Sequence, residues 1–233
     1  MTIEEGKKKL LTEKKHDIRS AEELVRILRS EEGCPWDREQ DHHSIRTEFI
    51  EETYEAVEAI DREDSALLRE ELGDVLFQVL FHTEIEREAG RFDLDDVTTE
   101  LCDKMIYRHP HVFGSTEVAG TEEVLSNWDR LKSEEKSRLT LRQTLEAVPK
   151  QYPSLLRARK IAKKAEKGGA GFGPESDRKE GLLALAQKIA EADGEERRGL
   201  LTELIWQAVI LAGPDADLEK DLGDLLDRFI ESF

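Results

Sequence analysis

Two groups of carboxylates lie about one helix apart in this chain, Glu51, Glu52 and Glu55 first, then Glu71 and Asp74. Residues three or four apart share one face of a helix, so each group places its carboxylates side by side. The connection between the two segments is short, so we expect two antiparallel, packed helices with the groups facing each other. Carboxylates this close repel one another, and a hard cation with oxygen ligands, usually Mg²⁺, removes that repulsion. The sequence therefore predicts a metal site inside a helical bundle.

Asp74 strengthens this prediction, because it stands in an apolar stretch, Leu72 to Phe81, whose only other polar side chain is Gln78. An ionised carboxylate buried there is costly unless it is paired or binds a cation. We therefore expect Asp74 to be buried. The alternative is a solvated acidic helix face, which is what most charge runs form. His82 continues the same stripe, either as a core histidine or as a group that orients a carboxylate or reaches a phosphate.

Composition excludes several classes of protein. The 233 residues carry a formal net charge of −18, which argues against a nucleic-acid partner, because phosphate backbones are held by dense basic patches. No run of 18 apolar residues suggests a transmembrane helix, and the lysine-rich start does not resemble a secretory signal. Cys34 and Cys102 are the only cysteines, too few for a disulfide framework. We expect a reduced, cytoplasmic protein.

The hydrophobic pattern predicts an all-α fold, since nearly every segment has helical period and no stretch alternates convincingly as a strand. Residues 1–17 are expected to be a frayed, charged lead, and Ser20 with Glu23 a capping box. The loop 33–37 is expected to be rigid, and Pro149–Pro153 is the predicted boundary between modules at 18–145 and 150–233. The expected helices of the first module are 20–29, 44–60, 65–88, 95–107 and 121–137.

Six short motifs follow one another in an order typical of one family. They are Gly33-Cys34-Pro35-Trp36-Asp37, Gln40, His42-His43-Ser44, Glu51-Glu52-Thr53-Tyr54-Glu55, Glu71-Leu72-Gly73-Asp74 and Arg108-His109-Pro110-His111-Val112-Phe113. Each motif alone is weak evidence, but six in order are specific. The chain resembles the MazG family of nucleoside triphosphate pyrophosphohydrolases, most strongly over residues 25–135.

The resemblance implies Mg²⁺-dependent hydrolysis of a nucleoside triphosphate to the monophosphate and pyrophosphate, and a homodimer. It implies that all five carboxylates are metal ligands and that Arg108 and Lys132 bind phosphate. Tyr107 stands where many members have a second arginine, which makes Lys104 an alternative phosphate ligand. Trp36 could stack on the base or anchor the core. Two other functions stay open: a hydrolase of one modified or signalling nucleotide, and a non-catalytic regulatory protein that binds nucleotide or metal.

The second half resembles a degenerate second copy of the same module. Lys160–Ala165 and Gly171-Phe172 match the linker that precedes that copy. Apolar side chains then stand where the acidic motifs belong, and only Glu203 keeps a carboxylate. Asp221 and Asp224 imitate the missing motif without a glutamate-rich partner helix. The second module is therefore expected to serve structure or dimerisation.

Overall fold

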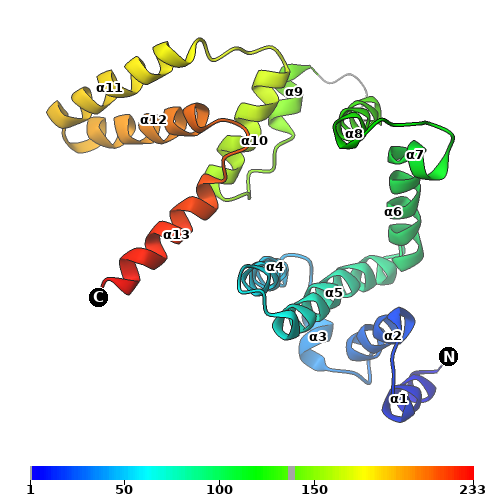
Figure 1. The fold of residues 1–233 in the computed structure, drawn as a ribbon. Helices are drawn as coiled ribbons and strands as arrows, with labels where there is room; N and C mark the ends of the chain where they lie inside the picture. Colours follow the sequence, from blue (N-terminus) through cyan, green and yellow to red (C-terminus); the bar gives the residue numbers. More distant parts are fainter. Residues whose placement is uncertain (1, 136–139) are drawn as a thin grey trace. The chain divides into compact units, whose positions relative to one another are not determined.

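The computed structural model describes residues 2–135 and 140–233, and every regular element within them is a helix, so the predicted all-α class is confirmed. The chain forms two compact units, residues 1–131 and 132–233. Figure 1 shows the order of the helices. The predicted modules, which place the boundary some residues later, stay a prediction beside these units.

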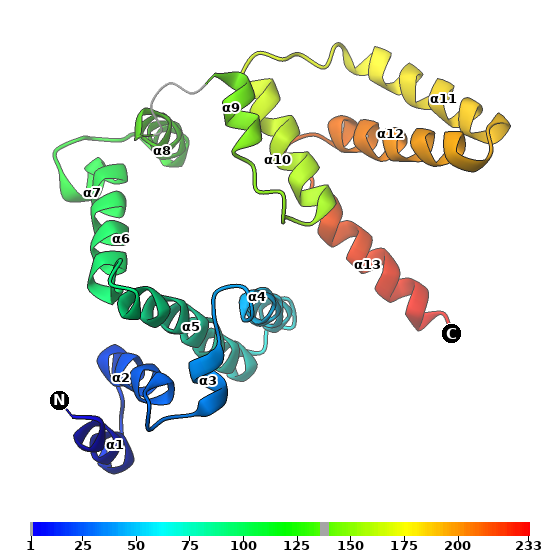
Figure 2. The ribbon, with the colours of Figure 1, turned by 180° about the vertical axis from the view of Figure 1, so that it is seen from behind.

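The first unit is built around one long helix. Its helices are α1 (Ile3–Thr12), α2 (Ile18–Arg29), α3 (Pro35–Glu39), α4 (Arg46–Asp61), α5 (Ser65–Glu88), α6 (Leu94–Arg108), α7 (Pro110–Phe113) and α8 (Thr121–Glu135), which runs past the unit's end. Helix α5 packs against α4, α2 and α6 (Figures 1 and 2). The bounds of α5 match those predicted, and the predicted end of α8 at Ser137 lies outside the described residues.

The prediction of a frayed N-terminal lead is wrong. Thr2 and Glu5 form a capping box that begins α1, and α1 packs on α2. Gly6 makes the contact possible, because a Cβ atom there would lie 2.7 Å from Glu23 Oε1. The predicted cap of α2 is also wrong: the helix begins earlier, where Asp17 accepts a hydrogen bond of 2.8 Å from the Ser20 backbone N–H. A carboxylate is an equally good N-cap, and it stands three residues ahead of the serine.

A small apolar core joins three of these helices and the start of α4. Its fully buried members are Val25, Ile45, Leu80, Phe81 and Leu94. They come from α2, from the residue that precedes α4, from α5 and from α6. Burial of such side chains stabilises the fold by roughly 1.5–3 kcal/mol each. The core therefore fixes α5 relative to α2, α4 and α6.

The second unit holds the remaining helices: α9 (Leu141–Glu146), α10 (Ser154–Lys167), α11 (Glu175–Glu191), α12 (Gly194–Ala212) and α13 (Leu218–Glu231). Helices α11 and α12 form its largest helix–helix contact, and α10 packs on α9, α12 and α13. The glycine-rich stretch 168–174 is a break between helices, as the sequence predicts. Across the described residues, no helix has the length and apolar character needed to span a bilayer.

Candidate metal centre

The site lies where α4 packs on α5, and a tight turn holds the two helices together. Arg62 ends α4, and Asp64 caps α5 by accepting hydrogen bonds of 3.0 Å from the backbone N–H groups of Ala66 and Leu67. Glu63, between them, has a positive φ of 54°, a conformation that is uncommon for a non-glycine residue and that is typical of tight turns. The short turn makes the two helices neighbours, as predicted.

Three of the predicted ligands meet across this contact. One carboxylate oxygen each from Glu52, Glu55 and Glu71 lies within 4.8 Å of the other two. Glu71 is buried, Glu52 half-buried and Glu55 exposed. The group therefore has a closed side on α5 and a side that is open to solvent on α4.

Burial and mutual repulsion raise the pKa of two of these carboxyls. For Glu71 the largest cause is burial, followed by the negative charges of Glu55 and Asp74. For Glu52 burial again comes first, followed by Asp74, Glu55 and Glu51. Negative charge is therefore unfavourable at this place in the isolated chain, and a bound cation would relieve it.

The donor set fits a hard divalent cation. The Oε2 atom of Glu71 is buried and has no hydrogen-bond partner. Over the described part of the chain, none of the ion pairs involves Glu52, Glu55 or Glu71. Buried carboxylates are normally paired or bound to metal, and oxygen ligands are those that Mg²⁺ prefers. These three residues would hold the ion.

Glu51 and Asp74, the other two predicted ligands, lie outside this group of three and are exposed. The expectation that Asp74 is buried is wrong for the single chain. Its apolar neighbours Leu72 and Leu76 are themselves 55% and 38% exposed, so this face of α5 is not covered. Asp74 still acts on the site, because its charge contributes to the raised pKa of Glu52 and of Glu71.

The predicted substrate-binding residues lie on other elements. Arg108 ends α6, is buried, and places its guanidinium carbon 5.2 Å from the centre of the Trp128 ring on α8. Lys104 lies one turn earlier on α6 and is exposed, whereas Lys132 belongs to the second unit. Trp36 on α3 is 59% exposed, so the alternative of a core anchor is wrong for it. Contact of these residues with a nucleotide stays a prediction.

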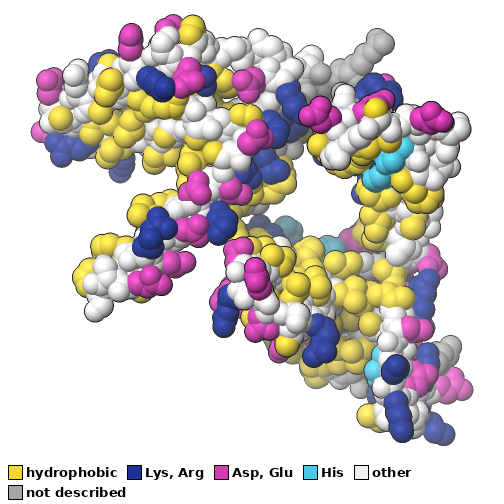
Figure 3. Space-filling model, in the orientation of Figure 1, with side chains coloured by type: hydrophobic (Ala, Val, Ile, Leu, Met, Phe, Trp, Pro, Cys, Tyr) yellow, Lys and Arg dark blue, Asp and Glu magenta, His cyan; other side chains and the backbone are white. Residues whose placement is uncertain are grey.

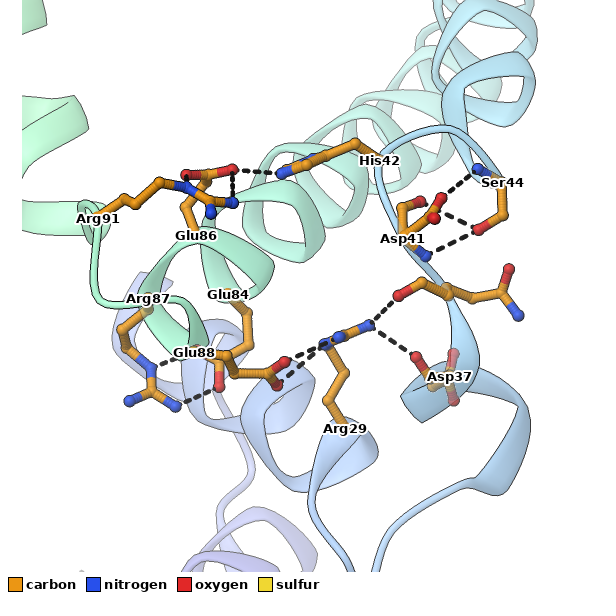
Figure 4. Close-up of polar contacts among 11 residues, drawn as sticks. Arg29, Asp37, Asp41, His42, Ser44, Glu84, Glu86, Arg87, Glu88 and Arg91 are labelled. Carbon is orange, nitrogen blue, oxygen red and sulfur yellow. Dashed lines mark hydrogen bonds and ion pairs between the residues drawn. The ribbon is translucent and has the colours of Figure 1, made fainter.

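A histidine pair lies farther along α5. His42 Nδ1 and His82 Nδ1 are 2.7 Å apart, with the ring centroids 5.0 Å apart and the rings stacked. On its other side, His42 Nε2 lies 2.5 Å from Glu86 Oε1 (Figure 4). Arg91 completes the chain with a two-pronged contact to Glu86. Burial and then the charge of His42 lower the pKa of His82, which favours a neutral ring that accepts from His42. Sequence reasoning left His82 open and missed the pairing, although Glu86 stands one turn after His82.

The prediction that 33–37 is a loop is wrong from Pro35 onward, where α3 begins, and Arg29 explains how this segment is held. It is 7% exposed and donates to the backbone oxygens of Asp37 at 2.7 Å and Gln40 at 3.0 Å, while a two-pronged ion pair joins it to Glu88 (Figure 4). Glu84 and Arg87 form a separate pair nearby. Gly33 is required there, because a Cβ atom would lie 2.1 Å from the Ile27 carbonyl oxygen. The motif therefore ties α3 to α2 and α5.

Comparison with known proteins identifies the family of the chain. Residues 40–113 match the MazG nucleotide pyrophosphohydrolase domain, a span that contains α4, α5 and all five predicted ligands. The chain is 37% identical to the nucleoside triphosphate pyrophosphohydrolase of Escherichia coli, over 87% of this chain and 72% of that protein. It is 37% identical to the nucleoside triphosphate pyrophosphohydrolase/pyrophosphatase MazG of Thermotoga maritima, over 91% of this chain and 83% of that protein. The nucleoside triphosphate pyrophosphohydrolase of Mycolicibacterium smegmatis is 37% identical to this chain, over 58% of this chain and 42% of that protein. This protein is therefore a member of the MazG family.

Proposed function

We propose that this protein is an enzyme that hydrolyses nucleoside triphosphates to the nucleoside monophosphate and pyrophosphate, with Mg²⁺ as its cofactor. The observation that carries the proposal is the meeting of Glu52, Glu55 and Glu71 within 4.8 Å, with one buried oxygen of Glu71 unpartnered. The relatives from Escherichia coli and Thermotoga maritima, of whose length this chain covers 72% and 83%, are named nucleoside triphosphate pyrophosphohydrolases. Glu51 and Asp74, on the rim of the group, complete the proposed ligand set.

Hydrolysis of a triphosphate needs cations to neutralise the phosphate oxygens and a carboxylate to accept the proton of the attacking water. When bound, Mg²⁺ would lower the pKa of the attacking water and neutralise phosphate oxygens. A carboxylate of the site takes the proton of the attacking water as the oxygen of that water bonds to the α-phosphorus. The bridging bond between the α and β phosphates breaks at the same time, and pyrophosphate leaves.

Cations of the chain would hold the triphosphate. Arg108 and Lys132 are the proposed phosphate ligands, with Lys104 as the alternative, because a chain with a net charge of −18 must place positive charge locally to bind a polyanion. The exposed ring of Trp36 is free of the core and suits stacking on a base. All four assignments are tested by the change in KM on substitution to alanine.

The decisive assay measures pyrophosphate release from a panel of common and modified nucleoside triphosphates, with Mg²⁺ and with EDTA. Release from several substrates that EDTA abolishes supports the proposal. Turnover of one modified nucleotide alone would favour a narrower hydrolase. Nucleotide binding without any release would identify a regulatory protein and contradict the proposal.

We further propose a homodimer formed through the α4–α5 face. Large apolar side chains are exposed along it, and Figure 3 shows hydrophobic side chains gathered over α5. They are Phe49, Ile50, Tyr54, Val57 and Ile60 on α4 and Leu72 and Leu76 on α5. Several large apolar side chains exposed on two neighbouring helices indicate an interaction surface. A second copy offers the same patch through a two-fold axis, and would cover the apolar neighbours of Asp74.

Light scattering after size-exclusion chromatography tests the dimer. Val57→Glu, at 46% exposure, should give a monomer because it places a charge in the centre of the patch. Leu183→Glu is the matched control, since Leu183 is 68% exposed and belongs to the second unit. A wild-type monomer would contradict the assignment. The absence of a nucleic-acid partner and the cytoplasmic location stay predictions.

A further inference from the structure

Two buried oxygens in the α4–α5 contact are left without a partner outside the three-carboxylate group. They are Oε2 of Glu48 and Oε1 of Gln78. Gln78 is 7% exposed, and Glu48 is half-buried. A carboxylate and an amide oxygen both accept hydrogen bonds, so neither can satisfy the other. A buried acceptor without a donor costs free energy, so this place favours a ligand that donates hydrogen bonds or carries positive charge.

The register of the two helices places these oxygens opposite each other. Glu55 faces Glu71 in the group of three. Ile45, ten residues before Glu55, shares the apolar core with Phe81, ten residues after Glu71. The antiparallel register is therefore constant between these two points. Seven residues before Glu55 stands Glu48, and seven residues after Glu71 stands Gln78, so the two meet across the contact.

Burial along α4 supports the same register. Ile45, which precedes α4, and Ala56 and Ala59 within it are buried, and Glu48 and Glu52 are the half-buried positions between Ile45 and Ala56. Spacings of three and four residues place all five on one helix face, the face that packs on α5. Asp74, the α5 residue opposite Glu52 in this register, is the neighbour whose charge acts most strongly on the Glu52 carboxyl.

We propose that Glu48 and Gln78 form a second cation site, one helical turn along α4 from the first. Its ligand is a hard divalent cation, since both donors are oxygens. With one carboxylate and one amide oxygen from the protein, the ion keeps coordination positions for water or phosphate oxygens, as Mg²⁺ in nucleotide sites usually does. The Cβ atoms of Glu48 and Glu52, four residues apart on one helix, lie about 5–6 Å from each other. Ions bound at the two sites would therefore be close enough to contact one triphosphate. The inference thus deepens the proposed function and rests on the first site.

Titration of the full chain with Mn²⁺, followed by electron paramagnetic resonance without nucleotide, tests the site. The wild type should bind two ions per chain, with a spectrum broadened by their proximity. Glu48→Gln and Gln78→Leu should each bind one ion and give a sharp, single-ion spectrum. Glu58→Gln is the matched control, because Glu58 is an exposed α4 glutamate paired with Arg62, and it should bind like the wild type.

The outcomes separate this inference from the proposed function. One ion in the wild type and in Glu48→Gln would overturn the second site and leave the first intact. Two ions in Glu48→Gln would also overturn it. No bound ion in the wild type would overturn both.

A gain-of-ligand variant covers the case in which Glu48→Gln fails to fold. Gln78→Glu adds a charged oxygen and should tighten binding of the second ion by about tenfold, since ligand charge tunes affinity. If the amide of Gln78 instead donates directly to Glu48, this variant would place two carboxylates in contact. It would then melt at a lower temperature with no gain in Mn²⁺ affinity, which overturns the proposal.

Discussion

The α4–α5 pair and the α11–α12 pair are built alike and differ in the carboxylates that they bring together. Both consist of two helices joined by a short connection, residues 62–64 in one and 192–193 in the other. Across the first pair carboxylates meet, and one oxygen of Glu71 is buried without a partner. In the second pair the lone acidic survivor, Glu203, accepts a hydrogen bond of 2.7 Å from Gln207 on its own helix. A carboxylate whose hydrogen bonds are made within the protein does not need a ligand, whereas a buried carboxylate oxygen without a partner favours one.

The contrast also separates packing from function. Helices of this kind pack without a group of three close carboxylates between them, since among the described residues no such group forms on α11 and α12. The acidic residues of α4 and α5 therefore oppose stability at neutral pH, because burial and repulsion raise the pKa of Glu52 and Glu71. Residues that cost stability in the free chain are expected to contribute through a bound cation.

Glu71→Gln should produce the largest effect, because it removes the charge of the buried ligand at nearly constant shape. We expect kcat to fall on the order of 10²-fold or more. The same variant should lose most of the increase in melting temperature that Mg²⁺ gives the wild type. Steady-state pyrophosphate release and thermal melts with and without Mg²⁺ measure both. Turnover near the wild-type value at saturating Mg²⁺ would remove the difference between the two helix pairs.

Arg29→Ala tests the scaffold of the first unit against that of the second. Arg29 is buried and holds Glu88 and two backbone oxygens, so its loss should lower the free energy of unfolding by about 3 kcal/mol. Arg159 is the counterpart in the second unit, where it contacts the Ala216 carbonyl at 3.0 Å and Asp217 at 3.1 Å. Because its side chain is 24% exposed, Arg159→Ala should cost about 1 kcal/mol. Urea denaturation of both variants measures the difference, and equal losses would contradict it.

Glu86 makes the acid stability of the first unit distinctive. Its hydrogen bonds with Arg91 lower its pKa from 4.5 to about 2. A carboxyl with a lowered pKa stabilises the fold above its unfolded value, and this stability is lost as the pH falls from about 4.5 to about 2. Glu86→Gln should therefore be less stable than the wild type at neutral pH and depend less on pH within this window. Urea midpoints at several pH values measure it, with Glu58→Gln as an exposed control. Parallel curves for wild type and Glu86→Gln would refute the assignment.

Local patterns predicted the helices well because their signals are local. The bounds of α5 follow from its N-cap Asp64 and from Gly90 beyond its end, both visible in the sequence. The meeting of Glu52, Glu55 and Glu71 follows from helical spacing and a short turn. The helical lead α1 was missed although the capping box of Thr2 and Glu5 is visible in the sequence, because the packing of α1 against α2 is not.

The exposure of Asp74 in the single chain could not be predicted from its apolar neighbours. Hydrophobic character indicates that a surface is to be covered, but not whether the same chain or another one covers it. The pairing of His42 with His82 and Glu86 is equally invisible, because it joins residues 40 and 44 positions apart. The role of Arg29 was missed for the same reason, since its partners are backbone oxygens and Glu88, 59 positions away.

The smallest effect is expected for Glu203→Gln. Glu203 keeps the only carboxylate where the second half would carry its acidic motif, so it is the residue through which that half could still contribute. Its partner Gln207 lies on the same helix, and no metal-ligating group forms around it in the described part of the chain. The variant should release pyrophosphate at the wild-type rate, with an unchanged oligomeric state by light scattering. Glu55→Gln is the matched substitution in the first pair, exposed like Glu203, and should lose activity. A fall of more than tenfold for Glu203→Gln, about 1.4 kcal/mol of barrier, would show that the second helix pair takes part in catalysis.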